Sequence, residues 1–260
     1  MRIFLRNTTI LFCFLLFVST SAEAQKKSRK MIKADQAFSV EQYNKAAELY
    51  KKAYQSAKSR AIKSEIIFKQ AECYRLSGNK KRAESYYKRA IKAKYPDVLV
   101  YLRYADILRM NEKYEEAKLQ YQKYIQLNPT DVSGEMGLKS CDYALSWLSN
   151  PTRYQVELMP LINSRFSDFS PSFGNGEYSE VFFTSSRSGG FSNKIDDRTG
   201  ETFTDIYSSK LNKKGKWSVP TMLAEPINSA GNEGSVVLNK RGTTMYFTKC
   251  DVQKKKSLGC

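Results

Sequence analysis

The sequence predicts a multidomain protein in which an α-solenoid of helical hairpins is followed by a domain of short β-strands. The first half repeats the motif Tyr-x-x-Ala-x-x-x-Tyr at helical spacing. The second half repeats other segments: Ile162-Asn163-Ser164 recurs 65 residues later at Ile227, and Phe182-Phe183-Thr184 recurs 64 residues later at Tyr246. Repeats with periods of this length indicate stacked structural units, so we expect a binding scaffold and not a catalyst.

The composition is that of a folded, non-catalytic chain. Its 260 residues are 41% hydrophobic and 13% aromatic, which is enough for two domains. The chain contains no histidine, which excludes Ser-His-Asp and Cys-His catalysis and histidine ligation of metals. A Gly-x-Ser-x-Gly hydrolase motif is also absent. We therefore expect no enzyme activity, no catalytic residue, no metal site, no cofactor and no small-molecule substrate.

Residues 1–24 have the pattern of a secretory signal peptide. Arg2 and Arg6 precede an apolar run at residues 10–18, and Ala22-Glu23-Ala24 supplies a small-x-small cleavage pattern. An uncleaved membrane anchor is the alternative, but the apolar run is shorter than the ~20 residues that a spanning helix needs. We therefore expect an exported protein.

The net charge of +17 does not by itself indicate nucleic-acid binding. Basic residues attract polyphosphates, but an exported chain rarely meets them. The lysines and arginines are spread along the helices without a base-reading motif. We interpret them as solvated helix faces and expect no nucleic-acid partner. An anionic surface, such as lipid headgroups or an acidic cell-wall polymer, is the alternative.

Residues 25–150 form the helical domain in this interpretation. Alanines at helical spacing allow two helices to cross closely, while larger tyrosines fill the space beside each crossing. A proline ends the last unit, because it has no N–H and a fixed φ. The residues expected to pack the repeats are Tyr43, Ala46, Tyr50, Ala53, Ala71, Ala83, Tyr87, Ala90, Ala105, Tyr114, Ala117, Tyr121 and Pro129.

A further helix is expected from Asp131 to about Ser149, with Asn150-Pro151 as its stop signal. It would cap the array, since a terminal unit must cover an apolar face that would otherwise be exposed. The helical domain would then contain about seven helices. The apolar residues of the capping helix that are available for burial are Met136, Leu138, Cys141, Ala144, Leu145 and Leu148.

The alanine and tyrosine positions resemble those of the tetratricopeptide repeat, a helical hairpin of about 34 residues. Ala83 and Ala117 are 34 residues apart, and Ala46 and Ala83 are 37 apart. The resemblance implies about three repeats in a short superhelix, whose concave face commonly holds a peptide or helix of a partner. The alternative is that the array only orients the following domain. Because aromatic and arginine side chains dominate interface energetics, the candidate groove residues are Tyr74, Arg75, Arg103, Tyr104 and Arg109.

After Pro151 the pattern changes to short alternating runs separated by Gly, Asn, Ser and Asp, which indicates β-strands. Strands are expected at residues 178–184, 205–211, 234–238 and 243–248. We expect the carboxylates of Asp168 and Glu233 to fix strand starts by accepting backbone N–H groups, and not to hold a ligand. The run from Asp196 to Glu201 lacks the full pattern of a calcium loop and is expected to be an exposed acidic loop.

The strand half resembles the WD40-like propeller repeats related to the Tol system. The resemblance rests on Ser-Asp-Phe-Ser-Pro-Ser-Phe at residues 167–173, Phe-Thr-Ser-x-Arg at 183–187, Asp-Ile-Tyr at 205–207 and Trp-Ser at 217–218. It implies that residues 151–260 are the first one to two blades of a β-propeller, which is truncated here. The residues that carry the blade motifs would be Asp168, Pro171, Phe183, Arg187, Asp205, Tyr207, Trp217, Glu233 and Phe247.

Four cysteines follow the signal-like segment, and no pair has the C-x-x-C spacing of a zinc site. Cys250 and Cys260 flank a polar stretch suited to a hairpin loop, and in an oxidising compartment we expect a disulfide between them. Cys73 and Cys141 fall on apolar helix faces, where a buried thiol is the default and a disulfide is the alternative.

The order of these parts (signal-like segment, tetratricopeptide repeats, WD40-like propeller) resembles the PorE-like, OmpA-family envelope proteins of Bacteroidetes. That resemblance implies a periplasmic, outer-membrane-associated scaffold of the type IX secretion and gliding machinery. Protein partners would bind the helical groove and the propeller, and an OmpA-like domain beyond residue 260 would link the complex to peptidoglycan. Two alternatives stay open: an envelope adaptor unrelated to secretion, and the propeller accessory part of a peptidase.

Overall fold

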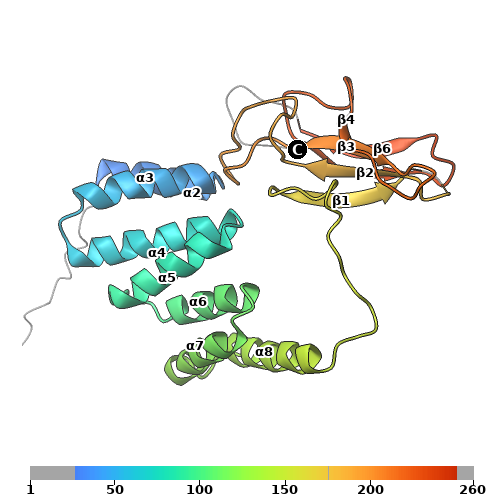
Figure 1. Cartoon of the computed structure of the whole chain (residues 1–260). Coiled ribbons are helices and arrows are strands. Elements are labelled where there is room, and N and C mark those ends of the chain that lie inside the picture. The colour runs from blue at the N-terminus through green and yellow to red at the C-terminus, as the bar shows by residue number, and fades with distance from the viewer. Residues whose placement is uncertain (1–26, 175, 251–260) are drawn as a thin grey trace, which may run out of the picture.

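The computed structural model describes residues 27–174 and 176–250 (Figure 1). The signal-like segment and Cys260 lie outside these residues, so export and the disulfide between Cys250 and Cys260 stay predictions. Within the described residues no helix is both long and apolar enough to cross a membrane. The helices are α2 (Arg29–Ser39), α3 (Tyr43–Ser56), α4 (Arg60–Leu76), α5 (Lys80–Lys92), α6 (Leu99–Met110), α7 (Tyr114–Leu127) and α8 (Ser133–Ser149).

The helices pack as three hairpins, α2–α3, α4–α5 and α6–α7, and α8 follows against α7 (Figure 1). The hairpins share one core, in which the predicted alanines are at most 1% exposed and permit close helix crossings. Tyr50, Tyr87 and Tyr121 are the largest fully buried side chains of the described residues and fill the space beside these crossings. Of the other expected packing residues, Tyr114 is half-buried, and Pro129 is exposed beyond the end of α7.

The turn inside each hairpin contains a residue with a left-handed backbone. Glu41, Gly78 and Glu112 have φ angles of 60°, 81° and 62°, and they follow the first helix of the three hairpins at equivalent positions. Glycine adopts this conformation without a steric penalty, whereas the two glutamates do not. The repeat seen in the alanines therefore extends to the backbone of the turns.

The last helix closes the array only in part. α8 buries Cys141 against α7, but Met136 and Leu148 are 65% and 67% exposed. The expectation that these two side chains are buried is wrong, because α6 and α7 cover one face of α8 and leave the other face open. Cys73 and Cys141 are buried free thiols, so they do not form a disulfide.

The strand domain contains a four-stranded antiparallel sheet and a separate hairpin (Figure 1). The sheet has the order β1 (Asp168–Phe173), β2 (Glu180–Ser185), β3 (Asp205–Lys210) and β4 (Thr221–Met222). The hairpin consists of β5 (Glu233–Leu238) and β6 (Met245–Lys249), and β5 packs against β1 and β2. Both sheets are open within the described residues, so the structure shows a small antiparallel β-domain and not a closed propeller.

The hairpins β1–β2 and β5–β6 repeat the same backbone irregularity. The pairing register shifts after Phe169 in the first hairpin and after Gly234 in the second. Ser170 and Ser235, which are 65 residues apart, have positive φ angles of 50° and 53° at these bulges. The sequence repeat is therefore also a structural repeat.

Asp168 and Glu233 hold equivalent turns before these strands. Asp168 accepts the backbone N–H of Ser164 at 2.5 Å, and Glu233 accepts that of Ser229 at 3.0 Å. Both acidic side chains are buried. This backbone contact is the one that we expected of the two carboxylates.

Arg187 completes the first of these turns. Its guanidinium lies 2.8 Å from Asp168 and donates to the Ile162 carbonyl at 2.6 Å. It also lies over the rings of Phe183 and Tyr207, at 5.0 and 4.9 Å from their centroids. Three other blade-motif residues have apolar side chains. Trp217 is half-buried against the cluster that contains Phe183 and Tyr207, and Phe247 is half-buried against the cluster that contains Phe182 and Ile206. Pro171 is exposed in β1.

Residues 196–201, which we call the docking loop, attach the strand domain to the first hairpin of the array. The carbonyl of Asp197 accepts the N–H groups of Asn44 and Lys45, at 2.9 and 3.3 Å. These N–H groups lie at the start of α3, which has no side-chain cap of its own. The expectation of an exposed acidic loop holds only in part: Arg198 and Thr199 are exposed, but Asp196 is buried. The loop also satisfies helix-end donors that would otherwise need water or a side chain.

Two ion pairs flank this contact. Lys45 lies 3.0 Å from Asp197, and Arg198 lies 3.1 Å from Glu41. All four side chains are more than 40% exposed, so each pair contributes at most about 1 kcal/mol. The chain reaches the strand domain through a linker, residues 150–161, that is exposed along its length (Figure 1).

Candidate protein-binding surface of the helical array

A row of tyrosine–carboxylate hydrogen bonds runs along the array, with one in each hairpin. The pairs are Tyr50–Asp35, Tyr87–Glu72 and Tyr121–Asp106. The oxygen–oxygen distances are 2.6 Å in the first pair and 2.8 Å in the third. Each tyrosine comes from the second helix of its hairpin and each carboxylate from the first, so the bond ties the two helices together. We call this set the tyrosine–carboxylate ladder.

The electrostatics of the ladder keep its hydroxyl groups protonated. Burial is the largest cause that raises the pKa of Tyr50, Tyr87 and Tyr121 above the usual value. The neighbouring carboxylates raise the pKa further, because a phenolate would place a second negative charge beside each of them. Each carboxylate therefore keeps its hydroxyl donor at neutral pH.

In two of the hairpins an arginine follows the carboxylate by three residues. Arg75 lies 2.6 Å from Glu72 and also donates to the Tyr87 hydroxyl at 3.2 Å. The guanidinium and the carboxylate neutralise each other, and the pair is mostly buried, with the two side chains 24% and 13% exposed. Arg75 therefore completes the middle unit of the ladder.

The equivalent residue of the next hairpin, Arg109, is bonded differently. It donates to the Tyr121 hydroxyl at 3.2 Å, but it forms no ion pair with any residue that the structure describes. Asp106, whose side chain is one methylene shorter than that of glutamate, pairs with Arg103 at 3.7 Å instead. The terminal nitrogens of Arg109 are therefore available to an acceptor from outside the chain.

The five residues proposed to line the groove divide into two groups. Tyr74 and Tyr104 are 6% and 7% exposed and pack inside the array. Arg75, Arg103 and Arg109 are half-buried, and the side chains of Arg75 and Arg103 are 24% and 34% exposed. The array therefore presents arginines to a partner more than tyrosines of this set.

A groove of 520 Å³ lies between Arg109 and the open face of α8, and we call it the α8 groove. Its lining residues are Arg109, Tyr114, Ser140, Tyr143, Ala144 and Trp147. Tyr143 and Trp147 are 66% and 74% exposed. Exposed aromatic side chains beside an arginine are typical of protein-binding surfaces. Sequence reasoning missed Tyr143 and Trp147, although their spacing of four residues on α8 marks one helix face.

The strand domain carries a buried carboxylate that lacks a full set of partners. Asp205 is 1% exposed, and one of its oxygens accepts the Phe191 N–H at 2.9 Å. Within residues 27–174 and 176–250, the other oxygen has no hydrogen-bond partner, and neither does the buried hydroxyl of Tyr207. Burial raises the pKa of Asp205 to about 6; the Phe191 N–H opposes this rise, and the charge of Glu233 adds to it.

We expect Asp205→Asn to raise the melting temperature of the strand domain at neutral pH and to change it little at about pH 4. The Asp205 carboxyl titrates near 3.8 in the unfolded chain and near 6 in the folded protein. Between these values the folded state binds the proton more tightly, so stability falls as the pH rises through this window. The difference between these two pKa values corresponds to at most about 3 kcal/mol of folding free energy. The asparagine side chain of the variant carries no charge, so this cost is absent.

The melting temperature is measured by Trp217 fluorescence in a Trp147→Phe background, since Trp217 packs on the cluster that contains Tyr207. Glu177→Gln, at an exposed carboxylate of the same domain, is the control and should show no stabilisation at either pH. An equal effect of Asp205→Asn at both pH values would contradict the assignment of a raised pKa.

Two of the hairpins match a known repeat family. The tetratricopeptide repeat family matches residues 64–96 and 98–131, which contain most of α4–α5 and all of α6–α7. These two hairpins are therefore similar to tetratricopeptide repeats. The hairpin α2–α3 lies outside the matched residues, but it has the same buried alanines and the same ladder bond, between Tyr50 and Asp35.

Several solved structures resemble part of the chain. The Hsp90 co-chaperone Cns1 from Saccharomyces cerevisiae is 20% identical, with a TM-score of 0.43, over 46% of this chain and 39% of its own. The first tetratricopeptide domain of Spaghetti (RPAP3), bound to the HSP90 peptide SRMEEVD, is 22% identical, with a TM-score of 0.41. The match covers 45% of this chain and 90% of that domain. The second tetratricopeptide domain of human RPAP3, in complex with an HSP70 peptide, is 18% identical, with a TM-score of 0.40. The match covers 44% of this chain and 92% of that domain. This chain thus spans well under half of the yeast co-chaperone. No curated protein matches it.

Proposed function

We propose that this protein is a non-catalytic adaptor that binds partner proteins through its helical array. The tetratricopeptide match supports an interaction role, since repeats of this kind form extended binding surfaces. The observation that carries the proposal is the α8 groove. There Arg109 has no carboxylate partner among the residues that the structure describes, and it lies beside the exposed rings of Tyr143 and Trp147.

The α8 groove suits a peptide segment that has an apolar side chain and an adjacent acceptor. Tyr143 and Trp147 offer flat apolar surface, which releases water when an apolar side chain covers it. Arg109 would donate to a carboxylate or carbonyl oxygen of the partner, with Tyr121 holding its Nε in place. The groove volume of 520 Å³ lies in the range of ligand-binding pockets.

Peptides that bind the intact protein can be selected from a random displayed library. We expect the affinity of these peptides to fall at least about tenfold in the Trp147→Ala variant and in the Arg109→Ala variant. Truncation of a central tryptophan or arginine typically costs an interface about 2 kcal/mol or more, which corresponds to more than tenfold in the dissociation constant. The affinities are measured by isothermal titration calorimetry.

Lys139→Ala is the matched control, because Lys139 is exposed on α8 but does not line the groove. This variant should bind the selected peptides as the wild type does. Peptides whose affinity is unchanged by both Trp147→Ala and Arg109→Ala would exclude the α8 groove as the binding surface.

We further propose that the adaptor works in the cell envelope, as a periplasmic, outer-membrane-associated scaffold of the type IX secretion or gliding machinery, linked to the cell wall through an OmpA-like domain. The signal-like pattern of residues 1–24 supports export. The bulges at Ser170 and Ser235 support a strand domain built from one propeller blade and part of the next. An envelope adaptor without a secretion role, and the accessory part of a peptidase, are the alternatives.

Fractionation of the native cells tests this part of the proposal. A mature protein that begins at Gln25 and co-purifies with peptidoglycan and with secretion-machinery proteins is the expected result. Export without secretion partners would favour the unrelated adaptor. Recovery from the cytoplasm with residues 1–24 retained would exclude an envelope role.

A further inference from the structure

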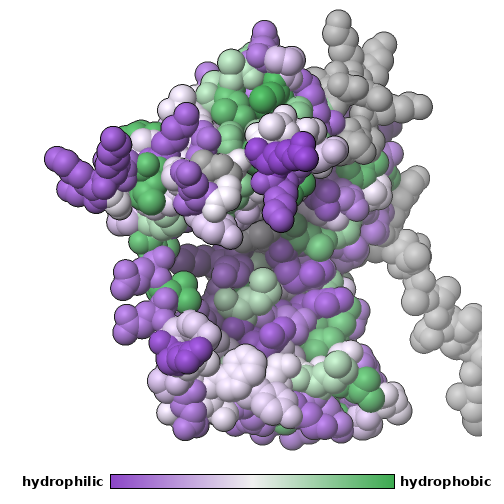
Figure 2. Space-filling model, turned by 90° about the vertical axis from the view of Figure 1, so that its right-hand side faces the viewer, coloured by the Kyte–Doolittle hydropathy of each residue, from purple (hydrophilic) through white to green (hydrophobic). Residues whose placement is uncertain are grey.

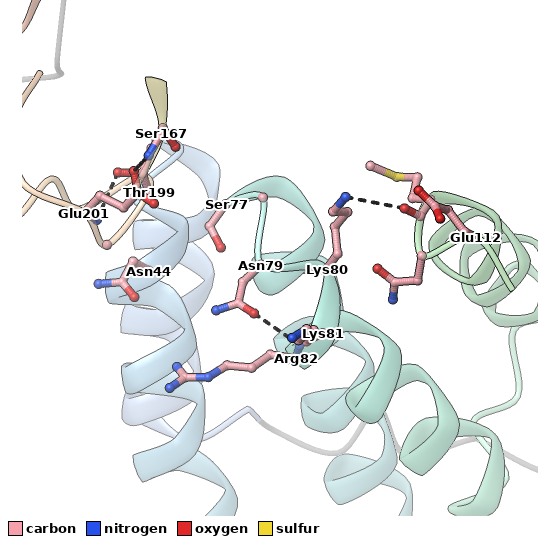
Figure 3. Close-up of a pocket in the computed structure, with 14 residues that line it drawn as sticks. Asn44, Ser77, Asn79, Lys80, Lys81, Arg82, Glu112, Ser167, Thr199 and Glu201 are labelled. Carbon is pink, nitrogen blue, oxygen red and sulfur yellow. Dashed lines mark hydrogen bonds between the residues drawn. The ribbon is translucent and has the colours of Figure 1, made fainter. Parts of the chain in front are cut away.

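A second recess lies between the two domains, and we call it the interdomain cleft. It has a volume of 680 Å³, which is in the range of ligand-binding pockets. The array contributes the α4–α5 turn, the start of α5 and the α6–α7 turn, and the strand domain contributes Ser167 and part of the docking loop. Figure 2 shows a hollow between the strand domain above and the helices below, and Figure 3 shows the lining side chains. The interdomain cleft shares no lining residue with the α8 groove.

Three consecutive basic residues, Lys80, Lys81 and Arg82, line the cleft at the start of α5. None of them has a carboxylate partner among the described residues. Lys80 donates to the Met110 carbonyl at 3.4 Å, and Arg82 lies over the Tyr74 ring, 5.5 Å from its centroid. Basic residues on the neighbouring turns, in contrast, are ion-paired. Among the described residues, the positive charge at the start of α5 is therefore not neutralised by an ion pair.

This charge arrangement is unfavourable for the chain on its own. The positive end of a helix dipole favours acidic side chains in the first turn. Like α2, α3, α4 and α6, α5 has no acidic residue in its first turn, and it begins with three consecutive basic residues instead. Three adjacent cations also repel one another. Carboxylates supplied by a partner would relieve both effects.

We propose that the interdomain cleft binds an acidic segment of a partner polypeptide, with Lys80, Lys81 and Arg82 contacting its carboxylates. The other walls suit the backbone of such a segment, because the amide of Asn44 and the hydroxyl of Thr199 line the cleft opposite the basic residues (Figure 3). These groups can donate to peptide carbonyls and accept from peptide N–H groups. The site requires both domains, since Asn44 belongs to α3 and Thr199 to the docking loop.

Two acidic residues of the cleft distinguish a peptide from a polyphosphate. Glu112 and Glu201 also line the recess. A continuous row of phosphates would pass close to these carboxylates and be repelled, whereas a peptide can direct its N–H groups toward them. The net charge of +17 adds a long-range attraction for acidic partners. The proposal is independent of the α8 groove.

The probe for this site is a fluorescein-labelled peptide, Gly-Glu-Asp-Glu-Asp-Gly, whose binding to the intact protein is followed by fluorescence anisotropy. We expect Lys81→Glu/Arg82→Glu to weaken binding at least about tenfold, since charge-assisted hydrogen bonds are lost. The control is Lys51→Glu/Lys52→Glu, which changes the net charge equally at exposed positions of α3 outside the cleft. It should weaken binding less than about threefold. Equal losses in the two double variants would mean nonspecific attraction and would overturn the proposal.

A second variant tests the contribution of the strand domain without any change of net charge. Asp197→Lys/Arg198→Glu reverses both ion pairs of the docking loop, with Lys45 and Glu41. Loss of one wall of the cleft should weaken peptide binding at least about fivefold, whereas nonspecific attraction predicts no change, which would overturn the proposal. Tighter binding of a labelled hexathymidylate than of the peptide would also overturn it, in favour of single-stranded nucleic acid. Trp147→Ala should leave peptide binding at the cleft unaltered, which separates this result from the test of the α8 groove.

Discussion

Replacing Asp168 with alanine is expected to destabilise the strand domain by about 3–5 kcal/mol, the typical cost of leaving a buried charge without its partner. The side chain of Arg187 is 17% exposed, lies 2.8 Å from Asp168 and contacts the rings of Phe183 and Tyr207. Loss of Asp168 would leave this guanidinium with neutral acceptors only. It would also leave the Ser164 N–H without its acceptor at 2.5 Å.

Thermal unfolding that is followed separately for the two domains tests this expectation. The chain has two tryptophans, and in a Trp147→Phe background the fluorescence of Trp217 reports the strand domain alone, while circular dichroism reports the helices. Only the Trp217 transition should move in Asp168→Ala. Asp168→Ala/Arg187→Met removes both charges and should recover much of the loss. A loss below about 1 kcal/mol in the single variant would contradict a buried, paired charge.

Asp168 and Asp205 make the strand domain respond to acid in opposite directions. Burial acts to raise the pKa of Asp168, but hydrogen bonds from Ser185 and Arg187 outweigh it and lower that pKa. The stabilisation that ionised Asp168 gives to the folded state is therefore fully present above the usual pKa of aspartate. It is lost as the pH falls through the lower pKa that Asp168 has in the folded protein. The contribution of Asp205, whose pKa is raised, is instead gained as the pH falls below about 6.

Replacing Tyr87 with alanine is expected to destabilise the helical array by about 3–5 kcal/mol, as for other large buried aromatic residues. The Tyr87 ring has no exposed surface and packs edge-on against Phe68, with 6.0 Å between ring centroids. Its hydroxyl donates to Glu72 and accepts from Arg75. Because each repeat contacts only its neighbours, a cavity in the middle hairpin weakens both interfaces of that hairpin.

Urea unfolding followed by circular dichroism at the helix band gives the free energy. Tyr87→Phe keeps the ring and removes only the hydroxyl, so it should cost about 1–2 kcal/mol, the value for an unsatisfied hydrogen-bond partner. Tyr154→Ala is the tyrosine control, because Tyr154 is 72% exposed in the linker. It should stay within about 0.5 kcal/mol of the wild type. Equal losses in Tyr87→Ala and Tyr87→Phe would mean that ring packing contributes nothing.

The helical half could be predicted from the sequence because its signal is local. The spacing of alanines and tyrosines determines which face of each helix is buried, and Tyr50, Tyr87 and Tyr121 are indeed core residues. The carboxylates that they bind could not be predicted in the same way. Asp35 and Asp106 lie among other charged residues on helix surfaces, and their pattern is that of a solvated face until the second helix brings a tyrosine to them.

The contact between the domains could not be predicted, because it depends on residues that are remote in sequence. Lys45 and Asp197 are 152 positions apart, and the docking loop by itself has the composition of an exposed acidic loop. The repeat of the strand segments was visible because Ser164 and Ser229 are followed at equal spacing by Asp168 and Glu233. The open face of α8 was missed for a related reason: apolar spacing identifies a face but not whether another element covers it.

The helical array is held by the strand domain at both of its ends. The linker joins the strand domain covalently to α8, and the Asp197 carbonyl fastens it to the start of α3 (Figure 1). Terminal units of a repeat array usually open first, since each has a single neighbour. Here the first hairpin has a second neighbour, so array, linker and strand domain form a mechanically closed ring. A force that lengthens or uncoils the superhelix must either break the contact at α3 or extend the linker. The contact at α3 thus adds a restraint on extension of the array that lies outside the repeats themselves.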